Sequence, residues 1–132
     1  GFNIDSITVG NSEIEGLSRM VITVHADEKG LEQVTKQLNK LIDVIKIKDI
    51  TQKAVKRELC LVKVNIPNAK ARAEIMQYTN IFRAHILDVT EESLMIELTG
   101  DKDKINAFIS LVEPFGIKRI ARTGLTAMSR GV

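Results

Sequence analysis

Two stretches of the sequence decide how the chain folds: VITVHADEKGL at residues 21–31 and MIELTGDKDKI at residues 95–105. Each begins like a half-buried strand, passes through a short break to an aspartate, and enters a segment with apolar residues at helical spacing. Aligned on one another, they place Val34 on Phe108 in the helices that follow. The chain therefore contains an internal repeat of a strand and an Asp-capped helix.

The second copy of the repeat lies within a longer regular pattern. Periodicity and turn residues predict a strand at Leu59–Ile66, a helix opened by Pro67-Asn68, a hairpin of His85–Val89 and Leu94–Thr99, a helix closed by Pro114 and Gly116, and a strand at Ile117–Arg122. The order βαββαβ is that of a ferredoxin-like fold.

The first copy has less sequence around it. Phe2–Val9 and Leu17–His25 predict a hairpin, and a phase slip in the first strand indicates a β-bulge near Asp5-Ser6. Asp27 is the expected N-cap of a helix whose apolar positions run from Leu31 to Ile45, and a strand at Val44–Ile50 is expected after it. Thr51–Arg57 is polar and without pattern, which favours a linker.

We therefore predict an α+β protein with two tandem ferredoxin-like domains, an incomplete one at residues 1–52 and a complete one at residues 53–132. The first copy opens directly with its hairpin, so the strand and helix that begin this fold have no counterpart there. The first strand is central in this fold, and its loss leaves backbone groups and an apolar face uncovered. We expect a domain truncated at its N-terminus, with supply of the missing piece by another chain as the alternative.

Composition excludes several classes of protein. The 132 residues carry 19 Lys+Arg, 17 Asp+Glu and one cysteine, Cys60, and 44% of them are apolar. These values are typical of an ordinary soluble domain, and they argue against membrane, collagen-like and disulfide-stabilised proteins. A cytoplasmic protein without a membrane partner is expected, because the first residues lack the pattern of a signal peptide.

The sequence offers little catalytic chemistry. His25 and His85 have no metal-ligand partners at suitable spacing, and Cys60 is expected to be a small, buried, unmodified residue. No catalytic triad or phosphate-binding loop is present, so no catalytic or metal-binding residue is assigned. RNA-binding sheets carry aromatic residues on their central strands, whereas the aromatic residues here fall on helices or after one. The residues alone therefore indicate a ligand-sensing or interaction module without a nucleic-acid partner.

Several segments together resemble one family. They are GFNIDSITVG at residues 1–10, LSRM at 17–20, LEQVTKQLNKLIDV at 31–44, REL at 57–59 with VKV at 62–64, FRA at 82–84, RTG at 122–124 and SRG at 129–131. In this order they resemble the regulatory (small) subunits of acetolactate synthase, also called acetohydroxyacid synthase. The resemblance covers essentially the whole chain.

The resemblance implies an N-terminal ACT domain and a second domain of similar topology. It implies a regulatory subunit without an active site, which activates a separate catalytic subunit and confers feedback inhibition by valine or another branched-chain amino acid. Thiamine diphosphate, Mg and FAD would belong to the catalytic subunit, so no cofactor is expected here. An amino-acid-sensing ACT module attached to a different enzyme or regulator is the alternative.

Two further expectations concern the hairpin. A homodimer is expected, because ACT-type sheets expose strand edges and apolar helix faces that pair with a second copy. Asn3 matches the family's effector-contacting asparagine, and an amide can bond both the ammonium and the carboxylate of an amino acid. Ile4 would add an apolar or main-chain contact. An asparagine that caps a turn at a strand entry is the alternative for Asn3, and weak or absent valine binding is expected for this form.

Overall fold

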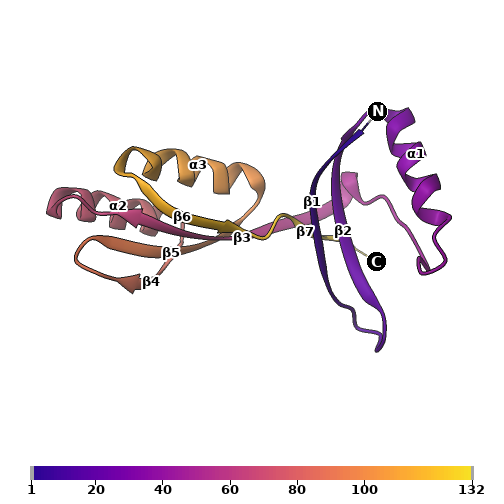
Figure 1. Ribbon diagram of the computed structural model, residues 1–132, viewed down its shortest axis with the longest axis horizontal. Helices are drawn as coiled ribbons and strands as arrows, with labels where there is room; N and C mark the ends of the chain where they lie inside the picture. Colours follow the sequence, from indigo (N-terminus) through magenta and orange to yellow (C-terminus); the bar gives the residue numbers. More distant parts are fainter. Residues whose placement is uncertain (1, 132) are drawn as a thin grey trace. The chain divides into compact units, whose positions relative to one another are not determined.

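The structure is a computed structural model that describes residues 2–131 (Figure 1). The chain forms two compact units: one holds residues 2–55 and 124–131, and the other holds residues 56–123. Strand β3 begins in the first unit and continues into the second. The division into domains at residues 1–52 and 53–132 concerns parts that fold independently, and it stays a prediction.

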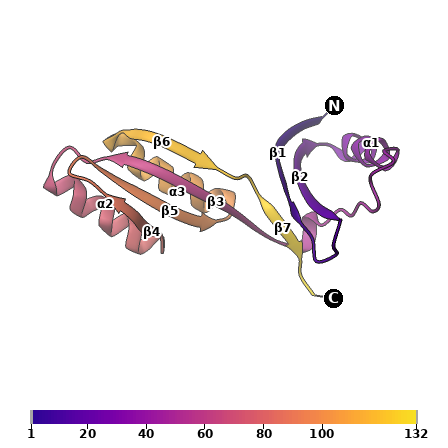
Figure 2. The same ribbon diagram turned by 60° about the horizontal axis from the view of Figure 1, so that its bottom comes forward.

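The second unit has the order predicted from the sequence. It contains β3 (Ala54–Asn65), α2 (Ala69–Ile81), β4 (His85–Val89), β5 (Ser93–Gly100), α3 (Lys102–Val112), the short 3-10 helix η2 (Glu113–Phe115) and β6 (Ile117–Arg122). The strands pair in the order β4-β5-β3-β6 and all pairs are antiparallel. Figure 2 shows both helices on one side of this sheet. The ferredoxin-like βαββαβ prediction is confirmed.

Local chemistry explains where the helices of this unit begin. The Asn68 side chain accepts a hydrogen bond from the Ala71 amide at 2.8 Å, and Asp101 accepts one from the Lys104 amide at 2.9 Å. Each bond satisfies an amide that has no partner inside the helix. The Asp cap read from the repeat is therefore present in the second copy.

The core of the second unit lies between the sheet and the two helices. Alternate residues of β3 and β5 point into it and are at most 1% exposed: Cys60, Val62, Val64, Leu94, Ile96 and Leu98. Ile75, Ile105, Phe108 and Val112 of the helices are fully buried against them. The burial predicted for Cys60 is confirmed, and burial raises the pKa of its thiol, an effect opposed by Arg122.

The first unit is built on a hairpin. It contains β1 (Phe2–Asn11), β2 (Ser18–Ala26), α1 (Glu28–Asn39), the 3-10 helix η1 (Thr51–Lys53), the start of β3, and β7 (Thr126–Ser129). Strands β1 and β2 form a two-stranded antiparallel sheet, and β7 pairs with β3. In Figures 1 and 2, α1 and β7 lie on opposite faces of the hairpin. Asp27 caps α1 by accepting from the Gly30 amide at 2.7 Å, as expected.

Three expectations for the first half were wrong. Residues 44–50 carry no strand, and α1 ends at Asn39 rather than continuing to Ile45. In a ferredoxin-like fold, a strand in the position of residues 44–50 is the fourth one and pairs with the first strand. The described part of the first unit holds no strand that could pair with residues 44–50 and receive their hydrogen bonds. Residues 51–57 are not a free linker, because they form η1 and the start of β3, which pairs with β7.

Candidate functional site

The hairpin of the first unit carries the residues singled out from the sequence. Its register runs from Asn3 opposite His25 to Asn11 opposite Ser18, with one shift between Ile4 and Ser6. The bulge predicted near Asp5-Ser6 is thus confirmed. A bulge adds one residue to one strand and restores the apolar alternation on the far side of the slip.

The bulge places Asp5 against a histidine of the other strand. Its Oδ2 lies 2.7 Å from Nε2 of His25, whose side chain is 69% exposed. This pair stands beside Asn3, which is opposite His25 in the register. The start of the hairpin therefore places an amide, a carboxylate and an imidazole close together on neighbouring strands. All three are hydrogen-bonding groups suited to a small polar ligand.

Asn3 and Ile4 do not present their side chains to the same space. Successive residues of a strand point to opposite faces, and Ile4 is opposite Val24 on the face that carries Ile7, Ile22 and Val9. Asn3 is exposed, and Ile4 is 52% exposed. A ligand bound by the Asn3 amide could therefore meet Ile4 through the main chain of β1, the second of the two contacts that the sequence suggested.

The apolar face of the hairpin is only partly covered. Helix α1 packs against β2, and its Val34 is buried. Ile4, Ile7, Val9 and Met20 on the same face remain 50–61% exposed. Contiguous exposed apolar residues of this kind mark surfaces that dock another protein segment.

The polar face of the hairpin holds the chain segment that returns from the second unit. The Thr8 hydroxyl donates to the Leu125 carbonyl at 3.0 Å. Gly124 has a φ of +81°, and a Cβ at this position would lie 2.7 Å from the Cβ of Ser6. Glycine is required here both for its backbone conformation and for the close approach. The RTG segment pointed to this position, but the sequence did not indicate what it touches.

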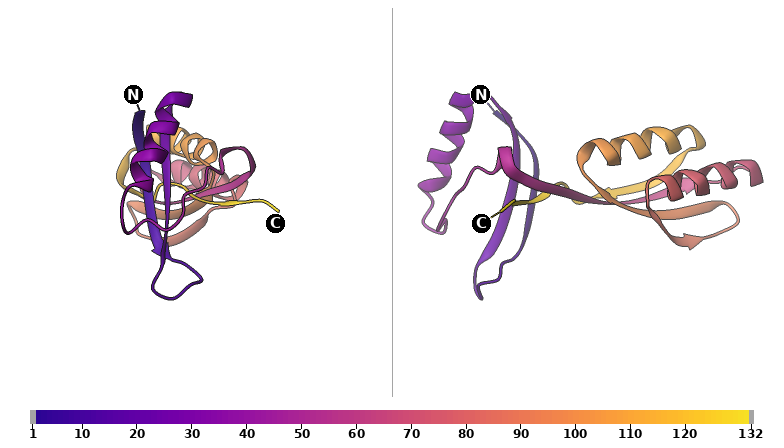
Figure 3. Two further views of the ribbon diagram at one scale, coloured as in Figure 1. Left: turned by 90° about the vertical axis from the view of Figure 1, so that its right-hand side faces the viewer. Right: turned by 180° about the vertical axis from the view of Figure 1, so that it is seen from behind.

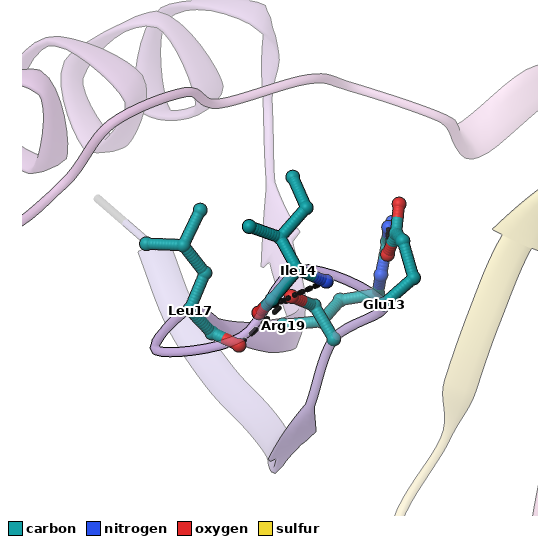
Figure 4. A network of polar contacts seen from close by, with 5 residues as sticks. Glu13, Ile14, Leu17 and Arg19 are labelled. Atoms are coloured by element: carbon teal, nitrogen blue, oxygen red, sulfur yellow. Dashed lines mark hydrogen bonds and ion pairs between the residues drawn. The ribbon is translucent and has the colours of Figure 1, made fainter.

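The far end of the hairpin closes with a polar network (Figure 4). The Ser12 hydroxyl donates to the Leu17 carbonyl at 2.8 Å, and the Leu17 amide donates to the Ile14 carbonyl at 3.1 Å. Arg19 Nη2 lies 3.1 Å from Glu13 Oε1. A backbone hydrogen bond, with help from Arg19, lowers the pKa of Glu13. The network fixes the shape of this loop by hydrogen bonds rather than by burial, since Ile14 at its centre is 55% exposed.

An ion pair in the second unit was also missed by sequence reasoning. Arg122 Nε lies 2.6 Å from Oε1 of Glu58, whose side chain is only 7% exposed, and Arg122 Nη1 donates to Asn106 Oδ1 at 2.9 Å. The ion pair joins β3 to β6, and the hydrogen bond from Arg122 to Asn106 joins β6 to α3. Both residues fall within segments that resemble the family, but their contact spans 64 positions of sequence.

Among residues 2–131, no group of three or more His, Cys, Asp or Glu side chains is arranged to hold a metal ion. None of the described helices is long and apolar enough to cross a membrane.

Comparison with known proteins assigns both units. A family model described as "AHAS small subunit-like ACT domain" matches residues 1–46, and one described as "Small subunit of acetolactate synthase" matches residues 57–131. The chain belongs to the acetolactate synthase small-subunit family. The resemblance stated from the sequence segments is therefore confirmed.

Individual relatives agree with this assignment. The chain is 60% identical to the probable acetolactate synthase small subunit of Methanothermobacter thermautotrophicus, over 99% of this chain and 79% of the relative. It is 50% identical to the acetolactate synthase small subunit of Bacillus subtilis, over 98% of this chain and 76% of the relative. The crystal structure of the small subunit from Thermotoga maritima matches with a TM-score of 0.89 and 47% identity, covering 100% of this chain and 83% of that one.

The two units match different domain models of this small-subunit family. The ACT-domain match covers the hairpin and α1, where Asn3, Ile4 and the Asp5–His25 pair lie. The second match covers the sheet with its closed core and the Glu58–Arg122 pair. The ACT assignment and the expected fold class, two tandem α+β units of which the first is incomplete, are both confirmed.

Proposed function

We propose that this chain is the regulatory subunit of an acetolactate synthase. In this role it has no active site, binds a separate catalytic subunit that carries thiamine diphosphate, Mg and FAD, and raises the activity of that subunit. It also transmits feedback inhibition by valine or another branched-chain amino acid. One observation carries the proposal: two small-subunit family models match in order and together cover most of the chain. A cytoplasmic location fits the single, buried Cys60.

The test is co-purification of this chain with the catalytic subunit, followed by an activity assay. Addition of the chain is expected to raise the rate of acetolactate formation. Because weak valine binding is expected for this form, inhibition by valine should be small, but greater on the raised rate than on the rate of the catalytic subunit alone. A chain that does not bind the catalytic subunit, but does bind an amino acid, would instead support an ACT module that serves a different enzyme or regulator.

Within this proposal, the chain forms a homodimer through the hairpin of its first unit. The support is the apolar face of Ile4, Ile7, Val9 and Met20, which is 50–61% exposed, and the strand edges of a two-stranded sheet. An Ile7→Asp change should weaken self-association, whereas Ile42→Asp should not, because Ile42 is 99% exposed and lies outside the hairpin. Equal self-association of both variants, measured by sedimentation equilibrium, would contradict this interface.

The effector site is proposed to include Asn3 and the main chain at Ile4. The support is the exposed amide of Asn3 beside the Asp5–His25 pair, together with its match to the family's effector-contacting asparagine. Asn3→Ala should weaken valine inhibition of the assembled enzyme at least about tenfold, the loss expected when one well-placed hydrogen bond to a charged group is removed. Asn11→Ala is the matched control, because Asn11 is an exposed asparagine at the other end of β1.

A further inference from the structure

The turn between α2 and β4 has an unusual backbone. Its central residue, Arg83, has a φ of +56°. Among residues 2–131, every other residue with a positive φ is a glycine. An L-amino acid at such a φ brings its Cβ close to the following carbonyl oxygen, and this contact is unfavourable. Arginine at this position therefore makes the folded chain less stable than glycine would.

Hydrogen bonds at the end of α2 explain why Arg83 adopts this conformation. The Arg83 amide donates to the Asn80 carbonyl at 3.2 Å. The Ala84 amide donates to the Thr79 carbonyl at 2.8 Å. These two bonds form the Schellman motif, in which a residue with positive φ follows the helix and is usually glycine. The end of the helix thus requires a positive φ at residue 83.

Packing on both sides of Arg83 holds the turn in place. The ring of Phe82 meets the ring of Phe108 edge-on, with 5.3 Å between the ring centroids. Phe82 and Ala84 are half-buried and pack against the core of the second unit. A strained residue persists where the surrounding structure fixes its conformation, and such residues are often functional. The fold therefore explains the backbone of Arg83, but not the choice of arginine.

The Arg83 side chain has no partner within the described chain. It is exposed, and among residues 2–131 it forms no ion pair or hydrogen bond. Ile81, at the end of α2, is 73% exposed, and Leu87, on the edge strand β4, is 49% exposed. We call Ile81, Arg83 and Leu87 the Arg83 surface. An exposed arginine beside apolar side chains is typical of the residues that contribute most to protein–protein binding.

We propose that the Arg83 surface binds the catalytic subunit, with the Arg83 guanidinium paired to a carboxylate of that subunit. This inference rests on the proposed function, which gives the chain this partner. A guanidinium has only donors, and their fork matches the two oxygens of a carboxylate. The apolar neighbours favour a carboxylate on a protein surface over a free, hydrated anion. The Arg83 surface shares no residue with the hairpin that is proposed for self-association.

The first measurement is activation of the catalytic subunit by full-length variants. Arg83→Gly and Arg83→Asn remove the guanidinium, and both new residues tolerate a positive φ. Each variant should need at least about tenfold more chain for half-maximal activation, the loss expected when one central arginine of an interface is removed. Arg83→Lys keeps the charge but not the planar fork of donors, so its loss should be smaller. Lys70→Gln is the matched control, because it removes an exposed positive charge from the other end of α2 and should change nothing.

The second measurement is the stability of the same variants. Arg83→Gly should raise the midpoint of denaturant unfolding, because glycine relieves the unfavourable backbone at residue 83. A gain in stability together with a loss of activation identifies a residue kept for binding. An arginine that served only the fold would lose stability when replaced.

Three results would overturn the proposal. Arg83→Gly and Arg83→Asn could activate at the same concentration as the original chain. Arg83→Gly could lower the unfolding midpoint, which would assign Arg83 to the fold. The variants could self-associate more weakly in sedimentation equilibrium while activation is unchanged, which would assign the surface to a second copy. An original chain that does not activate the catalytic subunit would overturn the proposed function itself, and this surface with it.

Discussion

The two units repeat one motif but bury their apolar residues very differently. In the second unit, strands β3 and β5 and helices α2 and α3 enclose a continuous core whose members are at most 5% exposed. In the described part of the first unit, the buried hydrophobic residues are Val34 and Leu125, each 9% exposed (Figure 3 shows both units). Four apolar residues on one face of its hairpin strands remain half-exposed or more.

The difference shows that local sequence determines whether a helix or strand forms, whereas packing against other elements determines how well it is buried. The strand, the Asp cap and the helix form in both copies, because those features depend on local sequence. In the second unit α2 packs on β4 and α3 packs on β5. In the first unit α1 packs on β2 and also contacts β1, and among the described residues no second helix covers the rest of the apolar face. Burial therefore depends on the number of layers rather than on the motif.

The sharpest test of this contrast is a truncation at equivalent positions of the repeat. Phe108→Ala should lower the free energy of unfolding by about 3–5 kcal/mol, the cost of removing a large, fully buried ring. Val34→Ala should cost about 1–2 kcal/mol, because Val34 is smaller, is 9% exposed and lies outside the closed core. Denaturant unfolding followed by circular dichroism measures both. Equal losses would mean that the two units are equally well packed in solution.

The second prediction concerns the ion pair that closes the end of the larger core. Arg122→Met should cost about 3 kcal/mol, because it leaves the carboxylate of Glu58 buried at 7% exposure without its partner. Glu58→Gln should cost less, about 1–2 kcal/mol, because Arg122 is 30% exposed and keeps its bond to Asn106. The order of the two losses, read from denaturant midpoints, is the test; a greater loss for Glu58→Gln would contradict this account.

The second unit was predictable because its signals are local and complete. Alternation, caps and closing residues gave every helix and strand of the βαββαβ order, and burial of Cys60 followed from its apolar neighbours. The Glu58–Arg122 contact was not predictable, because strand pairing brings together two residues that no local pattern relates.

In the first unit the predictions were wrong where the structure depends on strand pairing. Residues 44–50 alternate like a strand, but alternation describes a strand only when another strand is available to receive its hydrogen bonds. Strand β7 was missed because it is short and pairs with the start of β3, a segment whose polar composition favoured a linker. Of the candidate site, the sequence indicated Asn3 and Ile4 and the bulge, but not the Asp5–His25 pair that the bulge creates.

The third prediction tests the segment that crosses the hairpin. Gly124→Ala should cost about 1–3 kcal/mol, because it combines an unfavourable φ of +81° with a Cβ placed 2.7 Å from Ser6. Gly16→Ala is the matched control: it has a φ of +84°, but nothing lies within 4 Å of its added Cβ. The excess loss of Gly124→Ala over Gly16→Ala measures the contact itself. Addition of Ser6→Gly to Gly124→Ala should recover part of that excess, and no recovery would place the cost elsewhere.

The smallest expected effect lies at the exposed end of the hairpin. A backbone hydrogen bond and Arg19 lower the pKa of Glu13 below its ordinary value, so its charged form is favoured in the folded chain. A carboxyl with a lowered pKa contributes stability above its unfolded pKa, and this contribution disappears as the pH falls through the folded value. The stability difference between the original chain and Glu13→Gln should therefore be slight near neutral pH and absent in acid. Titration of the Glu13 carboxyl by NMR, in the original chain and in an Arg19→Met variant, gives the direct measurement. A Glu13 pKa in the folded chain at or above its value in the unfolded chain would show that the loop network does not hold the carboxylate in solution.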